Sequence, residues 1–137
     1  MAPNMAADSL GRPPFTIDDL ISELRWPAEA VDVGLVETAG GLRSPLADDG
    51  DCLALCAALR PDIAVLVADA GLGTINAVRL TLDALGPLAS AAVVVLNRFD
   101  AGSDLHHRNF EWLRRRDGLT VLTVPGSEAE LLELVRG

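Results

Sequence analysis

The sequence predicts an α/β fold: a parallel sheet of about four strands with helices on both faces. Short runs rich in Val, Ile and Leu alternate along the chain with stretches whose apolar residues recur at helical spacing. Two of these runs are apolar almost without alternation, as in strands that are covered on both faces. Successive strands lie about 30 residues apart, which is the length of a βαβ unit with a right-handed crossover.

The beginning of the chain predicts little regular structure. Residues 1–14 contain several prolines and no sustained period, so we expect an irregular lead-in. A short helix over residues 17–25 follows, because the Thr16 hydroxyl can accept a hydrogen bond from an otherwise unpaired amide at the helix start. Trp26 and Pro27 follow this helix and mark its end.

The remaining elements alternate between strand and helix. The expected strands are residues 31–36, 63–68, 92–96 and 120–124. The expected helices are residues 52–59, 75–85 and 105–116, and a last helix that Ser127 opens with Glu130 placed to complete a capping box. No internal repeat or linker divides the chain, so we expect one domain over residues 1–137.

The composition excludes several classes of function. A net charge of -9 argues against a protein that tracks a nucleic-acid backbone or an anionic membrane surface. No apolar stretch approaches the roughly 20 residues that cross a bilayer, and no secretory signal is recognisable. Two cysteines are too few for a disulfide framework. We therefore expect a cytoplasmic protein with no nucleic-acid or membrane partner.

Candidate site residues follow the expected strands, because ligands in open α/β sheets bind outside the carboxyl ends of the strands. Glu37 ends the first strand, and its carboxylate suits a magnesium ion held directly or through water. The alternative is a strand-end acid in a tight turn. Gly40 and Gly41 come next and allow the backbone to approach a ligand closely.

The loops after the later strands offer different chemistry. Residues 71–76 (GLGTIN) join a glycine turn to a helix amino terminus, which attracts anions; an ordinary capped helix is the alternative. Asn97 ends the third strand, where its amide suits a base edge or holds the next turn. Pro125 and Gly126 follow the fourth strand.

Other polar groups have simpler explanations. Cys52 and Cys56 share a helix face, but a pair supplies at most half a zinc site and small core residues are the simpler interpretation. His106 and His107 lie in a first helical turn without a partner signature. The arginines at 114–116 end a helix, where positive charge suits the dipole. The chain has no Gly-x-Ser-x-Gly elbow and no Gly-x-Gly-x-x-Gly after a strand.

Several segments, taken in order, resemble the dethiobiotin synthetases, which are ATP-dependent enzymes of biotin synthesis. The matching segments are residues 2–7 (APNMAA), 37–42 (ETAGGL) with 44–46 (SPL), 72–76 (LGTIN) with 80–81 (LT), 95–98 (VLNR) and 124–125 (VP). The resemblance extends from about residue 2 to residue 126 and implies a doubly wound, P-loop NTPase-like fold.

The resemblance also implies a reaction. The family closes a cyclic urea on 7,8-diaminopelargonate: carbon dioxide carboxylates an amine, and MgATP phosphorylates the carbamate. Carried over, Glu37 would bind Mg²⁺, and Asn97, Pro125 and Gly126 would contact the nucleotide. The loops implied for the diamine and for a homodimer interface contain Gly40, Gly41, Leu72, Gly73, Thr74 and Asn76. The implied cofactors are therefore Mg²⁺ and ATP.

The chain departs from the family in having no lysine and no glycine-rich phosphate loop. The matched segments are those downstream of that loop, so the resemblance implies a truncated P-loop NTPase-like domain. Thr38 stands where the family usually has glycine. In the family the phosphate-loop strand separates the strands at 31–36 and 63–68, so here these two pair directly or a partner chain fills the gap.

Three functions remain open. The first is the C-terminal part of a dethiobiotin synthetase-like enzyme, inactive alone and completed by another chain or a longer reading frame. The second is a non-catalytic binding or dimerisation module derived from that family. The third is an orphan fragment without activity. The nucleotide-contact motifs favour the first, and the missing lysine favours the second.

Overall fold

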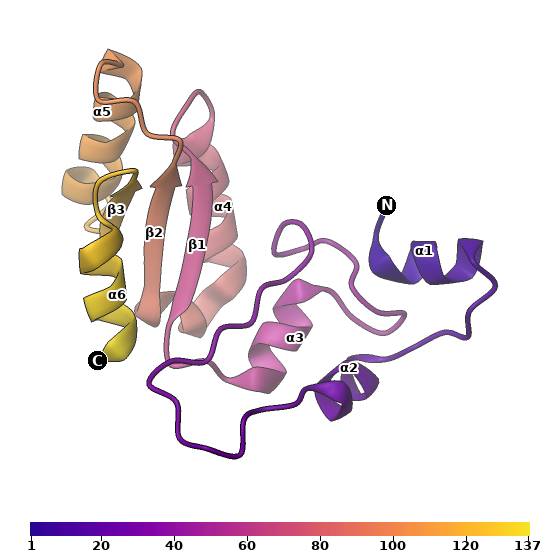
Figure 1. Ribbon diagram of the computed structural model, residues 1–137. Helices are drawn as coiled ribbons and strands as arrows, with labels where there is room; N and C mark the ends of the chain where they lie inside the picture. The colour runs from indigo at the N-terminus through magenta and orange to yellow at the C-terminus, as the bar shows by residue number, and fades with distance from the viewer. The chain divides into compact units, whose positions relative to one another are not determined.

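The computed structural model describes all of residues 1–137 and contains two compact units, residues 1–61 and 62–137. The N-terminal unit contains α1 (Pro3–Ser9), α2 (Ile17–Glu23) and α3 (Cys52–Leu59) (Figure 1). The C-terminal unit contains β1 (Ala64–Asp69), α4 (Thr74–Leu85), η1 (Gly86–Ala91), β2 (Ala92–Asn97), α5 (Asp104–Glu111), η2 (Trp112–Arg116), β3 (Val121–Val124) and α6 (Glu128–Arg136). The single domain expected over the whole chain stays a prediction.

Side-chain caps begin two helices of the N-terminal unit. Thr16 and Asp19 form a capping box on α2, in which each side chain accepts from the other residue's backbone amide. The Thr16 amide and then the Thr16 hydroxyl donate to the Asp19 carboxylate, and these two bonds lower the pKa of Asp19. Asp51 caps α3 by accepting from the Ala54 amide at 3.0 Å. The predicted starts of both helices are confirmed, because short polar side chains satisfy amides that a helix leaves free.

A small apolar core holds the N-terminal unit together. Its buried members are Ile17, Leu46, Ala47, Cys52 and Leu55. They come from α2, from α3 and from the loop before α3, so the two helices pack through their apolar faces.

Two predictions for the N-terminal unit are wrong. Residues 1–14 contain the helix α1, in which Pro3 occupies the first turn, where its missing amide costs nothing. Residues 31–36 form no strand, and Val31 and Leu35 are 54% and 80% exposed. A strand needs a neighbour to pair its backbone groups, and this segment has none.

The C-terminal unit confirms the α/β prediction. Its sheet is parallel with the order β1-β2-β3, and Asp69 pairs with Asn97, which in turn pairs with Val124. The three strands therefore end at nearly the same level. The sheet has three strands instead of the expected four, because residues 31–36 do not join it.

Helices cover both faces of this sheet, as predicted (Figure 1). On one face, Val94 and Leu96 pack with Val78 of α4 and Leu113 of η2. On the other face, the buried residues Val93, Val95 and Leu122 pack with Leu131 and Leu134 of α6. The alternation of β2 side chains between these two clusters explains its unbroken apolar run.

The boundaries of the later helices differ from the prediction by small amounts. The helix expected over 105–116 begins at Asp104, after the Ser103 cap, and changes to the π-helix η2 at Trp112. The predicted capping box of Ser127 and Glu130 on α6 is wrong, because the Ser127 hydroxyl accepts from the Thr123 amide at 3.4 Å and caps no helix amide. None of the helices combines the length and the hydropathy that a membrane span requires.

Candidate functional site

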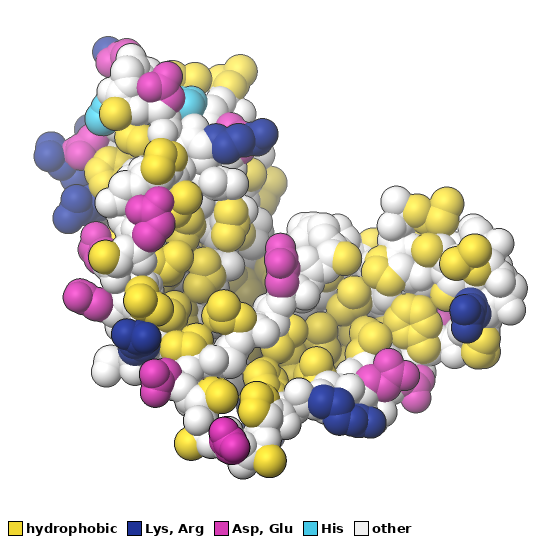
Figure 2. Space-filling model, viewed as in Figure 1, with side chains coloured by type: hydrophobic (Ala, Val, Ile, Leu, Met, Phe, Trp, Pro, Cys, Tyr) yellow, Lys and Arg dark blue, Asp and Glu magenta, His cyan; other side chains and the backbone are white.

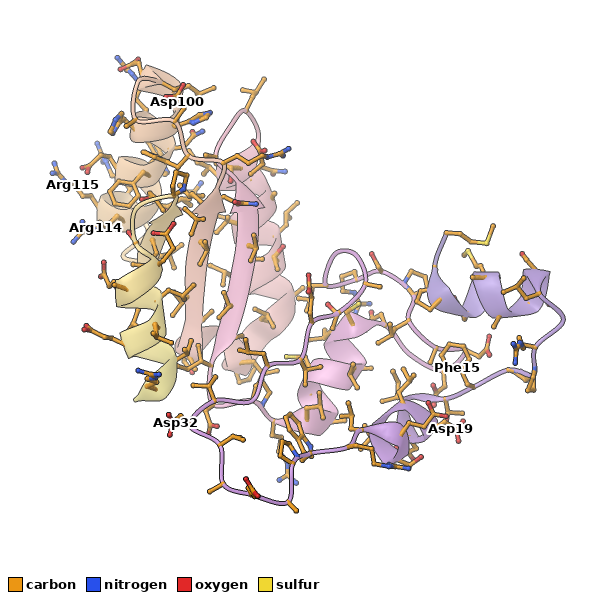
Figure 3. All side chains as sticks on the ribbon, in the orientation of Figure 1. Phe15, Asp19, Asp32, Asp100, Arg114 and Arg115 are labelled. Carbon is orange, nitrogen blue, oxygen red and sulfur yellow. The ribbon has the colours of Figure 1, made fainter.

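The carboxyl edge of the C-terminal sheet gathers the predicted residues of this unit. Asp69, Asn97 and Val124 end paired strands at matched positions. The loops that follow them, residues 70–73, 98–103 and 125–127, therefore open at the same edge, where α/β sheets bind ligands. In Figure 3, Asp100 marks the loop between β2 and α5.

The amino terminus of α4 lies at this edge. Gly73 precedes it with φ +90°, a conformation that L side chains rarely adopt. The amides of Ile75 and Asn76 lie in the first turn, where a helix has no acceptors of its own. The Thr74 side chain is buried, and its Oγ1 has no hydrogen-bond partner. This terminus therefore has unused donors for an anion.

Two predicted residues of this loop are strongly exposed. Leu72 is 94% exposed at the tip of the turn, and Asn76 is exposed on the first turn of α4. An apolar side chain left in water at a loop tip is available to a ligand or to another chain.

Asp69 organises the turn before α4, although no sequence pattern singled it out. Its Oδ1 accepts from the Gly71 amide at 2.8 Å, and its Oδ2 pairs with the Arg98 guanidinium. The pKa of Asp69 is lowered most strongly by the hydrogen bond from the Gly71 amide, then by Arg98 and by a weaker attraction to His106. Asp69 thereby links the end of β1 to the end of β2.

Asn109 is a second residue that the sequence analysis missed. It is 7% exposed, and its Nδ2 donates to the Ala70 and Gly71 carbonyls, both at 2.9 Å. Its position four residues before Leu113 on the buried side of α5 was the available signal, because a buried amide must find partners. The turn before α4 is thus also held from α5.

One side-chain atom of Asn97 makes a hydrogen bond within the chain. Its Oδ1 accepts from the Arg98 amide at 2.9 Å, which is the turn-holding alternative predicted for it. Its side chain is exposed, and the oxygen keeps a second lone pair beside the amide donors. Arg98 itself has φ 56°, an uncommon value outside glycine that marks a constrained position.

The loop after β3 is short and exposed. Pro125 and Gly126 are both exposed, and the Gly126 amide donates to the Glu128 carboxylate at 3.0 Å. Any acceptor from a ligand at this amide therefore has to displace or share the Glu128 bond.

Glu37, Gly40 and Gly41 belong to the N-terminal unit, outside any helix or strand. Glu37 is exposed and does not end a strand. Gly40 has φ +91°, and a Cβ there would lie 2.8 Å from the Ser44 Oγ, so the turn needs glycine. No group of three metal-ligating side chains gathers in the chain.

The other polar groups noted in the sequence have ordinary surroundings. Both cysteines are free; Cys52 is buried, and burial raises the pKa of the Cys56 thiol. His106 Nδ1 accepts from the Asp100 amide at 3.0 Å. The His107 Nε2 atom lies 2.9 Å from the Ala101 carbonyl oxygen.

The arginines at 114–116 lie on an exposed side of the C-terminal unit, where Figure 3 shows Arg114 and Arg115 extending outward. Arg115 pairs with Glu111, and the Arg116 guanidinium lies 5.7 Å from the centroid of the Trp112 ring. A solvated basic surface accounts for them without a ligand.

Comparison with known proteins identifies the family. A family model described as an AAA domain matches residues 2–127, which is most of the chain. The chain belongs to this AAA-domain family. Proteins similar to the chain include ATP-dependent dethiobiotin synthetases, so the resemblance predicted from the sequence motifs is confirmed.

Three of these similar proteins illustrate the match, and each is named ATP-dependent dethiobiotin synthetase BioD. The protein of Rhodococcus erythropolis is 36% identical over 127 residues, which are 91% of this chain and 54% of that protein. The Rhodococcus jostii protein is 34% identical over 134 residues, 96% of this chain and 58% of its own length. The Corynebacterium efficiens protein is 44% identical over 84 residues, 61% of this chain and 38% of its own length. The chain spans about half the length of the curated relatives it matches.

Proposed function

We propose that this chain forms the C-terminal part of a dethiobiotin synthetase in the biotin pathway, which closes a cyclic urea on 7,8-diaminopelargonate with carbon dioxide and MgATP. The observation that carries the proposal is the shared carboxyl edge of β1, β2 and β3. It presents an exposed Asn97 and an α4 terminus with unused donors, in a chain whose relatives bear that enzyme's name.

The α4 amino terminus suits the carboxylate of the diamine substrate. The Ile75 and Asn76 amides and the positive end of the helix dipole attract an anion, and the orphaned Thr74 hydroxyl adds a donor. The exposed Leu72 suits the aliphatic chain of the same molecule. In this proposal the turn binds and orients the substrate.

Asn97 and the loop of Pro125 and Gly126 suit the adenine ring of ATP. The amide of Asn97 keeps donors and an acceptor lone pair, as a base edge requires. The ring of Pro125 offers an exposed apolar surface beside them.

For Mg²⁺, the proposal names a single ligand from this chain. Glu37 is one exposed carboxylate, and magnesium at a nucleotide is commonly held by one or two carboxylates together with phosphate oxygens and water. Glu37 fits as one such ligand. Bound Mg²⁺ would neutralise phosphate charge, and in this proposal a partner or a further segment supplies the groups that hold the β- and γ-phosphates.

We propose that the catalytic assembly contains more than one chain copy, or a partner that supplies the phosphate loop. β1 is an edge strand, and its Val65 and Val67 are 39% and 60% exposed. Hydrophobic side chains are visible on this side of the C-terminal unit beside α6 (Figure 2). An unpaired edge with exposed valines favours association with a further strand.

Binding to the purified full chain tests the assignment of residues. MgATP is expected to shift the amide NMR signals of Asn97 and Gly126, and 7,8-diaminopelargonate those of residues 72–76. The proposal would be contradicted if neither ligand shifted these signals at millimolar concentration. Sedimentation at increasing chain concentration tests the homodimer separately.

Turnover tests the activity. The chain alone is expected to form no cyclic urea, and addition of the phosphate-loop half of the Rhodococcus erythropolis relative is expected to produce it in an ATP-dependent manner. The alternative is a non-catalytic binding or dimerisation module, which the lack of lysine favours. That module would associate and bind without turnover in either mixture. A reducing cytoplasm, which suits the two free thiols, belongs to the same proposal.

A further inference from the structure

The turn between β1 and α4 is held by side chains from β1, from α5 and from the loop after β2. Gly71 is bonded through both of its backbone groups: its amide donates to Asp69 of β1, and its carbonyl accepts from Asn109 of α5. Arg98, just after β2, pairs with the second oxygen of Asp69. A turn that contains two glycines and an exposed tip residue would otherwise have many conformations to lose on binding.

Asn109 makes the most buried of these contacts. Its Nδ2 donates to two successive carbonyls, those of Ala70 and Gly71, from a side chain that is 7% exposed. Ala70 is completely buried, so water has no access to its carbonyl region. Removal of the amide takes its side-chain donor from both carbonyls and leaves the Gly71 carbonyl only the longer bond from the Thr74 amide, at 3.4 Å. The buried Ala70 carbonyl loses the Asn109 bond, and a lost buried hydrogen bond favours movement of the turn.

The orientation of the Ala70 and Gly71 carbonyls determines which amides of the α4 terminus remain free. Because the Ala70 and Gly71 carbonyls point toward Asn109, their oxygens are engaged on the α5 side of the turn. The Thr74 amide bonds back to the Gly71 carbonyl at 3.4 Å, so this same peptide begins the helix. The Ile75 and Asn76 amides are then left as the free donors.

We infer that Asn109 is a positioning residue that holds the Ala70–Gly71 peptides so that the α4 amino terminus is preorganised to bind a carboxylate. It touches no substrate in this inference and acts only through the turn. The part that concerns the substrate rests on the proposed function. The part that concerns the turn does not, since it follows from the two hydrogen bonds.

Asn109→Leu in the full chain tests this inference, because leucine keeps the number and branching of the side-chain heavy atoms and removes the donor. Val93→Ala is the matched control; it removes buried volume from β2 on the opposite face of the sheet, away from the turn. The readouts are backbone amide NMR signals of the free protein, the melting temperature, and affinities for 7,8-diaminopelargonate and MgATP.

We expect Asn109→Leu to move the amide signals of residues 70–76 and to weaken diaminopelargonate binding by about tenfold, with MgATP affinity within about twofold of wild type. Val93→Ala is expected to lower the melting temperature without these local changes. The inference would be overturned if the amide signals of residues 70–76 did not move in Asn109→Leu. It would also be overturned if the signal changes in Asn109→Leu were distributed as in the Val93→Ala control. Asn109→Ser, which is small and polar, repeats the comparison if the leucine variant does not fold.

The two proposals fail in different ways. If wild type binds no diaminopelargonate while Asn109→Leu still moves the turn signals, the proposed function falls and the positioning of the turn stands. If wild type binds diaminopelargonate and Asn109→Leu binds it equally well, the proposed function stands and the positioning role falls.

Discussion

At the residue scale, the carboxyl edge of the C-terminal sheet depends on a few unusual backbone positions. Gly73 and Arg98 both have positive φ, at 90° and 56°, and each begins the loop or helix that follows its strand. Glycine adopts such a conformation without steric cost, whereas arginine does so only when its surroundings hold it. For Arg98 these surroundings are the Asn97 side chain and the Asp69 carboxylate.

Gly73→Ala is expected to lower the free energy of unfolding by about 1–2 kcal/mol, because the added Cβ strains a left-handed backbone. Nothing lies within 4 Å of that Cβ, so the effect is conformational and not a clash. Gly41→Ala, at ordinary φ and with only the Ser44 Oγ at 3.9 Å, is the control and is expected to change stability by less than about 0.5 kcal/mol. Urea unfolding followed by circular dichroism measures both; equal effects would exclude a special role for Gly73.

Asp69→Asn is expected to change how stability depends on pH. The bonds to Gly71 and Arg98 lower the pKa of Asp69 in the folded chain below its unfolded value. The stabilisation is therefore fully present above the unfolded pKa of about 3.9 and is lost as the pH falls through the folded value. Wild type is expected to be the more stable protein near neutral pH, with the difference vanishing in acid. A difference that stays constant with pH would show that the carboxylate charge is not responsible.

At the element scale, helices α4 and α5 are tied to the sheet and to each other by a few polar contacts around an apolar cluster. Asn109 joins α5 to the turn before α4, and Arg79 of α4 reaches Asp117 after η2 through bonds of 2.9 and 2.6 Å. The pair lowers the pKa of Asp117 and raises that of Arg79. The Arg79 guanidinium also lies 5.9 Å from the centroid of the Trp112 ring.

A double-mutant cycle over Arg79→Ala and Asp117→Asn is expected to give a favourable coupling between the two side chains at low salt. The bidentate geometry strengthens this coupling, and the half-exposed Arg79 side chain weakens it. In about 1 M salt the coupling is expected to fall, because screening then acts over about 3 Å. Zero coupling at low salt would mean that the interaction of Arg79 with Asp117 adds nothing to the free energy of unfolding.

At the scale of the whole molecule, the C-terminal unit has the more extensive core. Its sheet separates two buried clusters, one under α4 and η2 and one under α6. The N-terminal unit has a single small cluster around α2 and α3. Since buried apolar area is the main source of folding free energy, we expect the C-terminal unit to provide most of the stability.

Leu96→Ala is expected to lower the free energy of unfolding by about 2–5 kcal/mol, because Leu96 is fully buried at the centre of the sheet. Val67→Ala, at a site 60% exposed on the edge strand, is expected to cost less than about 1 kcal/mol. Chemical denaturation of both variants at a low, fixed chain concentration measures the two values. A large cost for Val67→Ala would indicate that another copy already covers that side of the sheet.

The amino-acid sequence by itself determined the strand–helix alternation of residues 62–137, most helix starts and the family. These follow from local causes: apolar runs at strand length, apolar spacing at helix period, and capping side chains such as Thr16 and Asp51. The sites at Glu37, Asn97 and Gly126 stay predictions. The failure at residues 31–36 is also physical, since β propensity forms a strand only where a neighbour pairs with it.

Only the tertiary structure decided which side chains meet at the carboxyl edge. Arg98 lies 29 residues from Asp69 in the sequence, and Asn109 lies 39 and 38 residues from the Ala70 and Gly71 carbonyls that it bonds. No local pattern marks such contacts. They arise because parallel strands end at one level and the helix after β2 packs back beside the turn after β1. The sequence contains the residues of the candidate site, and the parallel register brings together those of the C-terminal unit.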